Sequence, residues 1–224
     1  MQRLFDVLLS GMALLILMPL LLPVCFILLL TGEHEVFFKQ KRIGKDGREF
    51  FLYKFATMLK NSPALGHGTI TVKGDPRILP VGKFLRKTKL NELPQLLNIL
   101  LGEMSVVGPR PLTPQTFSAY PLAIQQVVVK VKPGLSGIGS VVFRAEEDML
   151  SREDASVFYA GVVAPYKGAL EEWFVSHRSL RSYFLLIMIT AWVVLFPRSA
   201  LVWRFFPSLP LPPDQLKPLL NYPT

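Results

Sequence analysis

The sequence predicts an α/β (mixed α+β) fold, a compact module with a membrane-inserted N-terminal helix and interfacial amphipathic helices. Three observations predict it. No charged residue occurs from Val7 to Gly32, alternating apolar and basic residues flank Asp46-Gly47, and leucines recur at helical spacing from Leu93 to Leu101. Half of the 224 residues are hydrophobic, which is enough for one core. The expected organisation is a membrane-inserted helix at 1–33, a folded module at 34–197 and a proline-rich tail at 198–224.

The apolar run at Val7–Gly32 predicts a helix that inserts in a membrane. It is too long for the apolar core of a signal peptide, and at about 1.5 Å per residue it matches a bilayer core of about 30 Å. Pro19 and Pro23 each remove a backbone donor, so we expect a kink near the middle. A sharply kinked helix enters and leaves by the same face, and both flanks then stay cytoplasmic, as Arg3 and the cations after Gly32 favour. We therefore expect a re-entrant helix in contact with membrane lipid.

The leucine repeat predicts the helix with the clearest pattern. Asn91 is placed to be its N-cap, Gln95 and Asn98 fall on its polar face, and Gly102 is placed to end it. Glu92 then lies at a helix N-terminus, where the positive end of the helix dipole favours an anion. The simplest interpretation of this carboxylate is that it stabilises the helix.

Other elements follow from local signals in the rest of the chain. The Asp-Gly step predicts a hairpin turn, and the prolines near the C-terminus predict an extended segment. The expected elements are strands at 36–38 and 50–53 around that turn, a strand at 138–143, a helix at 157–176 interrupted at Pro165, an interfacial or buried apolar helix at 183–196, and a tail at 207–224 without a core of its own.

Charge and cysteine content narrow the classes of partner. The net charge is +9, and positive charge follows the first apolar segment and surrounds the second. This arrangement suits an anionic membrane surface and phosphate-bearing substrates. Nucleic acid is the rival interpretation, but no segment resembles a base-reading module, so no nucleic-acid partner is expected. The single cysteine, Cys25, excludes an intrachain disulfide and a cysteine-based zinc site.

Arg110 is the strongest candidate for binding phosphate. Pro109 and Pro111 flank it and stiffen its backbone, so the guanidinium is held out with little entropy to lose. Such an arginine suits bidentate binding of a phosphate group. On the motif alone, a loop arginine paired with a surface acid is an equal alternative.

Taken in order, the motifs of this chain resemble those of the monotopic phosphoglycosyl transferases, the bacterial sugar transferase family that starts exopolysaccharide and glycoconjugate assembly. The resemblance covers about Arg3 to Phe196, and its specificity comes from the order and spacing of the motifs. Those motifs are Arg3–Asp6, Phe38–Gly44, Tyr53–Met58, Asp75–Arg77, Gly82–Arg86, Asn91–Leu96, Met104–Pro111 and Lys132–Gly134.

The resemblance implies an enzyme that transfers a phosphosugar from a UDP-sugar to polyprenyl (undecaprenyl) phosphate at the cytoplasmic face of the bacterial inner membrane, with Mg²⁺ and with release of UMP. In that family an aspartate-glutamate pair carries the chemistry, and the aspartate attacks the sugar-side phosphate. Here Asn91 stands in the aspartate position, and a neutral amide does not readily form an acyl phosphate. Ala56 replaces an arginine often found in the family, and Met18 replaces a serine before the kinking proline.

The resemblance and the charges together give the candidate site. Arg110 is expected to hold the diphosphate, and Glu92 to act as a catalytic group or magnesium ligand beside Asn91. Asp75 is a possible second magnesium ligand, and a turn-forming aspartate before proline is its equal alternative. The helpers of Arg110 that charge alone does not rank are Lys54, Arg77 and Arg86.

Asn91 leaves three interpretations open. In the favoured one Glu92 takes over and transfer occurs, for instance by direct attack of the lipid phosphate. In the second the chain is a catalytically impaired homologue that acts as a membrane-anchored binding or assembly partner. In the third Asn91 is an engineered change. Apolar helix faces also allow a homodimer, and the sequence does not identify the sugar.

Overall fold

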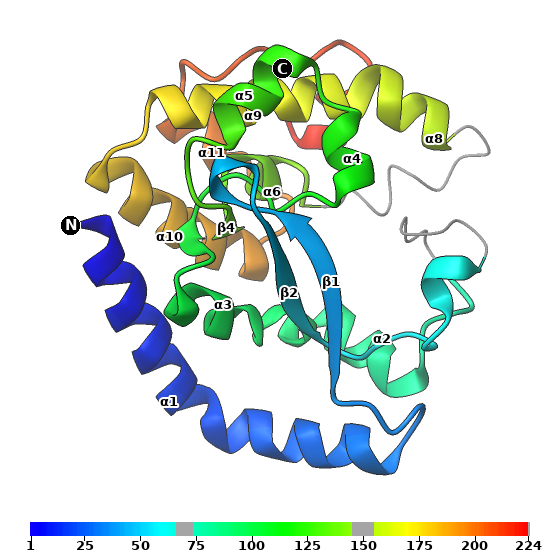
Figure 1. The fold of residues 1–224 in the computed structure, drawn as a ribbon. Helices are drawn as coiled ribbons and strands as arrows, with labels where there is room; N and C mark the ends of the chain where they lie inside the picture. The colour runs from blue at the N-terminus through cyan, green and yellow to red at the C-terminus, as the bar shows by residue number, and fades with distance from the viewer. Residues whose placement is uncertain (66–73, 145–154, 224) are drawn as a thin grey trace.

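The apolar N-terminal run forms one helix, α1, which changes direction part-way along its length in the computed structural model (Figure 1). Pro19 and Pro23 lie inside α1, and the two missing backbone donors account for a bend. By length and composition α1 qualifies to cross a membrane.

The structure describes residues 1–65, 74–144 and 155–223. Its elements are α1 (Gln2–Leu30), β1 (Phe37–Ile43), η1 (Lys45–Gly47), β2 (Glu49–Phe55), η2 (Ser62–Ala64), α2 (Pro80–Lys87), η3 (Leu90–Glu92), α3 (Gln95–Leu101), β3 (Ser105–Val107), α4 (Pro114–Ser118), α5 (Leu122–Val128), β4 (Gly134–Ser136), α6 (Ile138–Val142), α8 (Ala155–Phe158), η4 (Tyr159–Val163), α9 (Ala164–Ser176), α10 (Leu180–Leu195), α11 (Leu201–Phe205) and η5 (Lys217–Leu220).

A buried carboxylate fixes the start of α1 to the rest of the module. Asp6 is 2% exposed, and its Oδ1 accepts hydrogen bonds from Ser105 Oγ at 2.8 Å, Val106 N at 2.9 Å and Tyr183 Oη at 2.9 Å. These donors lie on β3 and α10, so one side chain joins three elements that are far apart in the sequence. The helix α1 is therefore an integral part of the fold rather than a loosely attached segment.

The predicted β-hairpin is confirmed, and it is longer than the sequence suggests. β1 and β2 pair antiparallel, from Phe37 opposite Phe55 to Ile43 opposite Glu49. Asp46 and Gly47 have φ angles of 58° and 74° in the turn. Glycine adopts this left-handed region freely and aspartate tolerates it, which explains the Asp-Gly step.

The predicted N-cap of the leucine-rich helix is wrong. α3 begins at Gln95, and Asn91 lies one turn earlier in the 3₁₀ turn η3. Lys89 adopts a left-handed conformation with φ 61°, and the chain then turns through successive short-range bonds such as Leu93 N to Leu90 O at 3.1 Å. Backbone carbonyls thus satisfy the donors that an N-cap side chain would otherwise bind. The predicted end is confirmed, because Gly102 is the left-handed C-cap with φ 88°.

The polar face of α3 is buried, although its side chains suggest an exposed surface. Asn98 is fully buried and binds the outer edge of β2, accepting from Tyr53 N at 3.0 Å and donating to Phe51 O at 2.7 Å. In contrast, Leu97 and Leu101 of the same helix are 39% and 67% exposed. The Asn98 amide thus pairs with β2 backbone groups that a third strand would otherwise bind. The exposed leucines suit an apolar environment.

The predicted strand at 138–143 is also wrong, because its first five residues form the helix α6. The strand lies just before it, where β4 pairs parallel with β3. A Cβ on Gly134 would lie 2.1 Å from Gly108 N, so only glycine permits this close approach of the two backbones. The pairing directs the chain after β3 straight into Pro109 and Arg110.

The C-terminal half forms the main hydrophobic core. The predicted helix at 157–176 is present, and Pro165 falls in the first turn of α9, directly after the π-helical turn η4. Because proline lacks a backbone N–H, the π turn accommodates it without ending the helix. The predicted apolar helix at 183–196 is α10. The tail has no core of its own and instead buries Leu209, Leu216 and Leu220 in the main core.

Replacing Leu216 with alanine is expected to destabilise the module by about 2–5 kcal/mol, because its side chain is fully buried in the main core. Thermal unfolding of the purified protein in one detergent measures the loss. Leu211→Ala is the matched control, since Leu211 is in the same tail but 74% exposed, and it should unfold within about 0.5 kcal/mol of the parent. Equal stability of the two variants would show that the tail does not contribute to the core.

Candidate functional site

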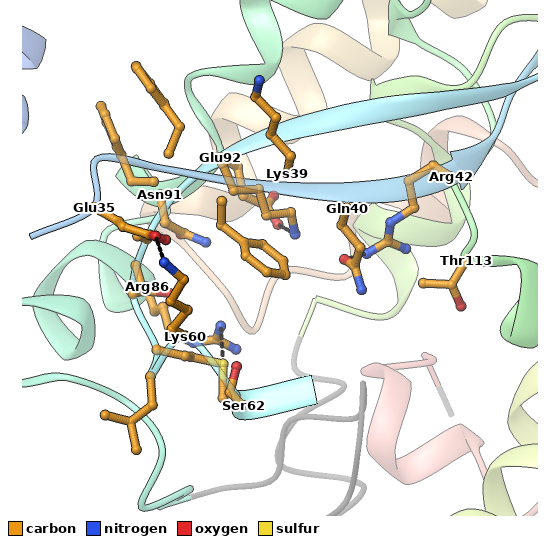
Figure 2. A pocket seen from close by; sticks show the side chains of 18 of the residues that line it. Glu35, Lys39, Gln40, Arg42, Lys60, Ser62, Arg86, Asn91, Glu92 and Thr113 are labelled. Atoms are coloured by element: carbon orange, nitrogen blue, oxygen red, sulfur yellow. Dashed lines mark hydrogen bonds and ion pairs between the residues drawn. The ribbon is translucent and has the colours of Figure 1, made fainter. Parts of the chain in front are cut away.

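A cavity of about 520 Å³ lies between the β-hairpin, the α2–η3 segment and the start of α9 (Figure 2). Its walls are strongly basic, which suits a ligand with several phosphate groups. The cavity size is within the range of small-ligand sites. The charged residues that line it are Glu33, Glu35, Lys39, Arg42, Lys54, Lys60, Arg86, Lys89, Glu92, Arg110 and Lys167.

Lys54 and Glu92 form an ion pair in the wall of this cavity. Lys54 Nζ lies 3.1 Å from Glu92 Oε1, which joins β2 to η3. Burial lowers the pKa of Lys54 to about 8, against the opposing effect of Glu92 and with a further lowering by Arg42. Burial acts to raise the pKa of Glu92, but the charges of Lys54 and Arg110 outweigh it and hold that pKa well below its usual range. Glu92 is therefore an ionised carboxylate surrounded by cations.

Asn91 lies beside Glu92 and is 6% exposed. Its side chain lines the cavity, and its Oδ1 has no hydrogen-bond partner among the residues that the structure describes. Arg42 Nε, a buried donor in the same wall, likewise has none within the described part of the chain. Unpaired buried polar atoms are costly, so a ligand or water in this cavity has both a donor and an acceptor to satisfy.

Two groups fix the backbone around Arg110. From one side, Arg42 Nη1 donates to Pro111 O at 2.8 Å. From the other, Arg110 N donates to Glu171 Oε1 at 3.2 Å. Burial, followed by the nearby charge of Arg110, lowers the pKa of Arg42 to about 10. Arg42 and Arg110 both line the cavity, an arrangement that favours an anion bound by the two guanidinium groups.

Glu171 is a buried acid that sequence reasoning missed. It is 1% exposed on α9, and burial raises its pKa to about 7. Lys167, one helical turn earlier, lines the cavity with its ammonium 5.2 Å from the centre of the Phe143 ring. A Lys and a Glu four residues apart in a largely apolar helical segment was the signal available in the sequence.

The raised pKa of Glu171 gives a pH dependence of stability. Because its pKa is about 7 in the folded chain against an ordinary 4.5, its contribution is fully present below about pH 4.5 and is lost as the pH rises through 7. Thermal unfolding should show the parent losing roughly 2–4 kcal/mol relative to Glu171→Gln between pH 5 and pH 8. Glu172→Gln, which removes the neighbouring carboxylate on α9, should keep the slope of the parent. A parent and Glu171→Gln with parallel pH profiles would contradict the assignment.

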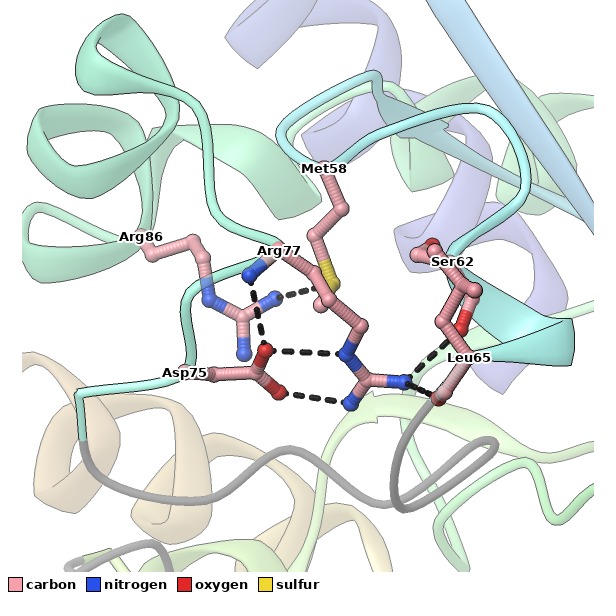
Figure 3. Close-up of polar contacts among 6 residues, drawn as sticks. All are labelled: Met58, Ser62, Leu65, Asp75, Arg77 and Arg86. Carbon is pink, nitrogen blue, oxygen red and sulfur yellow. Dashed lines mark hydrogen bonds and ion pairs between the residues drawn. The ribbon is translucent and has the colours of Figure 1, made fainter.

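Two of the predicted site residues lie elsewhere. Asp75 and Arg77 do not line the cavity. Arg77 Nε donates to Asp75 Oδ1 at 2.8 Å, and Nη2 donates to Oδ2 at 2.6 Å (Figure 3). Arg77 Nη1 also donates to Ser62 O and Leu65 O, at 2.7 and 2.6 Å. This buried pair fastens the segment after β2, and its position favours a structural role over phosphate or metal binding.

The remaining predicted residues meet at the cavity. Arg110, Lys54, Arg86, Glu92 and Asn91 all line it. Sequence reasoning did not assign several uncharged or basic lining residues. Gln40 and Arg42 lie beyond the predicted strand at 36–38, but they alternate on one face of the longer β1. The lining residues that were missed are Lys39, Gln40, Arg42, Lys60, Lys89, Thr113, Thr116, Tyr159 and Lys167.

The oxygen donors of this site fit a magnesium ion only as a minimal set. Mg²⁺ is usually held by one or two carboxylates, water and substrate phosphates. Glu92 offers one carboxylate, and the unpaired Oδ1 of Asn91 offers a neutral oxygen. Across residues 1–65, 74–144 and 155–223, no three His, Cys, Asp or Glu side chains gather as a metal site. A metal here would therefore depend on oxygens from the substrate.

Comparison with known proteins places the chain in a family. Residues 1–197 match the family model described as bacterial sugar transferase. This chain belongs to that family. The resemblance inferred from the motifs is thereby confirmed, and the matched region ends where the proline-rich tail begins.

Three relatives of this sugar transferase illustrate the similarity. UDP-glucose:undecaprenyl-phosphate glucose-1-phosphate transferase of Klebsiella pneumoniae is 37% identical over 163 residues, covering 70% of this chain and 34% of that protein. Undecaprenyl-phosphate galactose phosphotransferase of Salmonella typhimurium is 32% identical over 209 residues, 87% of this chain and 40% of that protein. Exopolysaccharide production protein ExoY of Rhizobium meliloti is 35% identical over 165 residues, 67% of this chain and 73% of that protein. The chain thus spans about a third of the first of these relatives.

Proposed function

We propose that this sugar transferase moves a phosphosugar from a UDP-sugar to polyprenyl (undecaprenyl) phosphate, giving polyprenyl diphosphate-sugar and UMP. The observation that carries the proposal is the basic cavity built around the Lys54–Glu92 pair and Arg110. The names of the relatives support the two substrates. The apolar helix α1 supports a lipid-soluble acceptor, with the reaction at the cytoplasmic face of a bacterial inner membrane.

The cations of the cavity would hold the diphosphate. Arg110 and Arg42 present two guanidinium groups, which bind phosphate oxygens in pairs. Lys54 adds a point charge, and Arg86 lines the wall beyond it. Together they neutralise the charge that builds up on the phosphoryl oxygens as the bond to the leaving group breaks. A magnesium ion, when bound at Glu92, supplies further neutralisation of the same charge.

The neutral Asn91 favours direct transfer over a covalent intermediate. A phosphate oxygen of the polyprenyl phosphate attacks the phosphorus that carries the sugar, and a new P–O bond forms. The bond from that phosphorus to the bridging oxygen breaks, and UMP leaves with the electron pair. Residues of the chain position the two phosphates in line, and Glu92 holds the charge of Lys54 in place. The alternative for an active enzyme is that Glu92 itself is the nucleophile.

The test is UMP release from a panel of UDP-sugars, with Mg²⁺ and polyprenyl phosphate, for the parent, Glu92→Gln and Asn91→Asp. Release that requires both the lipid acceptor and Glu92 would support direct transfer. Release of UMP by the parent without acceptor would contradict it and favour a covalent glutamyl intermediate. Omitting Mg²⁺ tests the metal requirement in the same assay.

A second function is favoured by one observation, the amide of Asn91 at the position of the family nucleophile. In this alternative the chain binds the substrates and acts as a membrane-anchored assembly partner of an active transferase. An inactive parent that binds UDP-sugar and gains activity on Asn91→Asp would establish it. If none of the three forms releases UMP and none binds UDP-sugar, both functions are excluded.

A further inference from the structure

A second group of cations lies outside the cavity, at the end of α3. Gly102 ends this helix with φ 88° and carries no side chain. A Cβ built on it would lie 3.4 Å from Arg3 Nη2 and 3.5 Å from Lys132 Nζ. Two cationic groups therefore approach one point, and neither residue lines the cavity described above. Gly102 itself contributes no side chain at this point.

The two cations are only partly neutralised by the protein. Arg3 Nη2 donates to Leu100 O at 2.7 Å, and Nη1 donates to Ile99 O. These carbonyls carry about half a negative charge at the helix C-terminus, against two full positive charges. Lys132 has no hydrogen bond or ion pair with the described residues, and burial, followed by the charge of Arg3, lowers its pKa against the opposing charge of Asp6. Asp6 is one carboxylate against two cations, and its Oδ1 already accepts three hydrogen bonds, so the pair keeps a net positive charge.

The surroundings of the pair identify the kind of anion. Leu4 follows Arg3 and is 61% exposed, Leu8 is 56% exposed one turn later, and Leu101 precedes Gly102 at 67% exposed. Apolar side chains so exposed at the start of a membrane helix belong in the acyl layer of a bilayer. Arg3 and Lys132 then lie at the depth where apolar surface ends, which is the level of lipid headgroups.

We propose that Arg3 and Lys132 bind the phosphate of an anionic phospholipid headgroup over Gly102. The occupant carries a net negative charge, because two cations gain more from such a headgroup than from a zwitterionic one. The site anchors the start of α1 at the membrane surface. This lipid site does not depend on the proposed transferase activity, so either proposal can be contradicted without affecting the other.

Native mass spectrometry of the detergent-solubilised protein tests the proposal, with short-chain phosphatidylglycerol and phosphatidylcholine as probes. We expect phosphatidylglycerol to bind the parent at least tenfold more tightly than phosphatidylcholine. Lys132→Gln should lose most of this preference, and Lys132→Arg should retain it. Lys217→Gln, which removes a tail cation that pairs with Asp214, is the matched control and should behave as the parent.

Three outcomes would overturn the proposal. One is equal binding of the two lipids by the parent. Another is an undiminished preference in Lys132→Gln. The third is displacement of phosphatidylglycerol by inorganic phosphate when both are present at the same millimolar concentration. This result would identify a site for a free anion rather than for a lipid headgroup. Arg3 is left unchanged in these variants, because its bonds to α3 make it part of the fold.

Discussion

Replacing Glu92 with glutamine is expected to lower the rate of UMP release by about 10²–10³-fold, the usual effect of removing one group that stabilises charge at a reacting centre. Glutamine keeps the shape of the side chain but removes the charge that holds Lys54, 3.1 Å away. Because Glu92 raises the pKa of Lys54, its loss should also shift the alkaline limb of the pH–rate profile below about pH 8. The measurement is UMP release at saturating UDP-sugar across pH 6 to 9.

The hairpin supplies a matched control for this prediction. Glu49 and Lys41 form another ion pair at 3.1 Å between β1 and β2, but both side chains are about half exposed and neither lines the cavity. Glu49→Gln removes the same charge from the same hairpin and should leave the rate within twofold. Comparable losses in Glu92→Gln and Glu49→Gln would point to a general effect on the hairpin. Full activity of Glu92→Gln would exclude Glu92 from the reaction.

Local signals in the sequence predicted the parts of the fold whose cause is local. The Asp-Gly step gave the hairpin, because the turn needs residues that accept positive φ. Gly102 marked the end of α3 for the same reason. The prolines around Arg110 indicated a stiff loop that presents its side chain, and Arg110 does line the cavity. Each of these predictions required only neighbours in the chain.

Predictions failed where distant segments decide the structure. The residues at 138–143 have strand-like side chains, yet the pairing of β4 with β3 places the strand before them. Asn98 looked like a surface residue because nothing near it in sequence reveals the open edge of β2. Asp75 and Arg77 looked like site residues because charge alone does not separate a cavity wall from a buried ion pair. Such distinctions depend on long-range contacts.

The coupling of α1 to the basic cavity is a further long-range feature. Asp6 of α1 holds Ser105 and Val106 of β3, and β3 leads directly to Pro109 and Arg110. Glu171 holds the backbone of Arg110 from the opposite side. A displacement of α1 would therefore move the strand that leads to Arg110 in the cavity wall. If α1 inserts in a membrane and the acceptor is a lipid, as proposed above, this contact chain links the position of α1 to the geometry of the site.

Replacing Asp6 with alanine is accordingly expected to cost about 3–5 kcal/mol of stability, because three donors around a buried carboxylate lose their acceptor. Thermal unfolding in detergent measures the loss, and limited proteolysis should cut the chain between α1 and β1 sooner than in the parent. Asp214→Ala, which removes a carboxylate that is 92% exposed, should unfold within about 0.5 kcal/mol of the parent.

Tyr183→Phe removes one of the three donors and should cost about 1 kcal/mol alone. In the Asp6→Ala background the same change should cost less, because the hydroxyl has already lost its partner. Additive losses would show that Tyr183 and Asp6 contribute independently and would contradict this coupling.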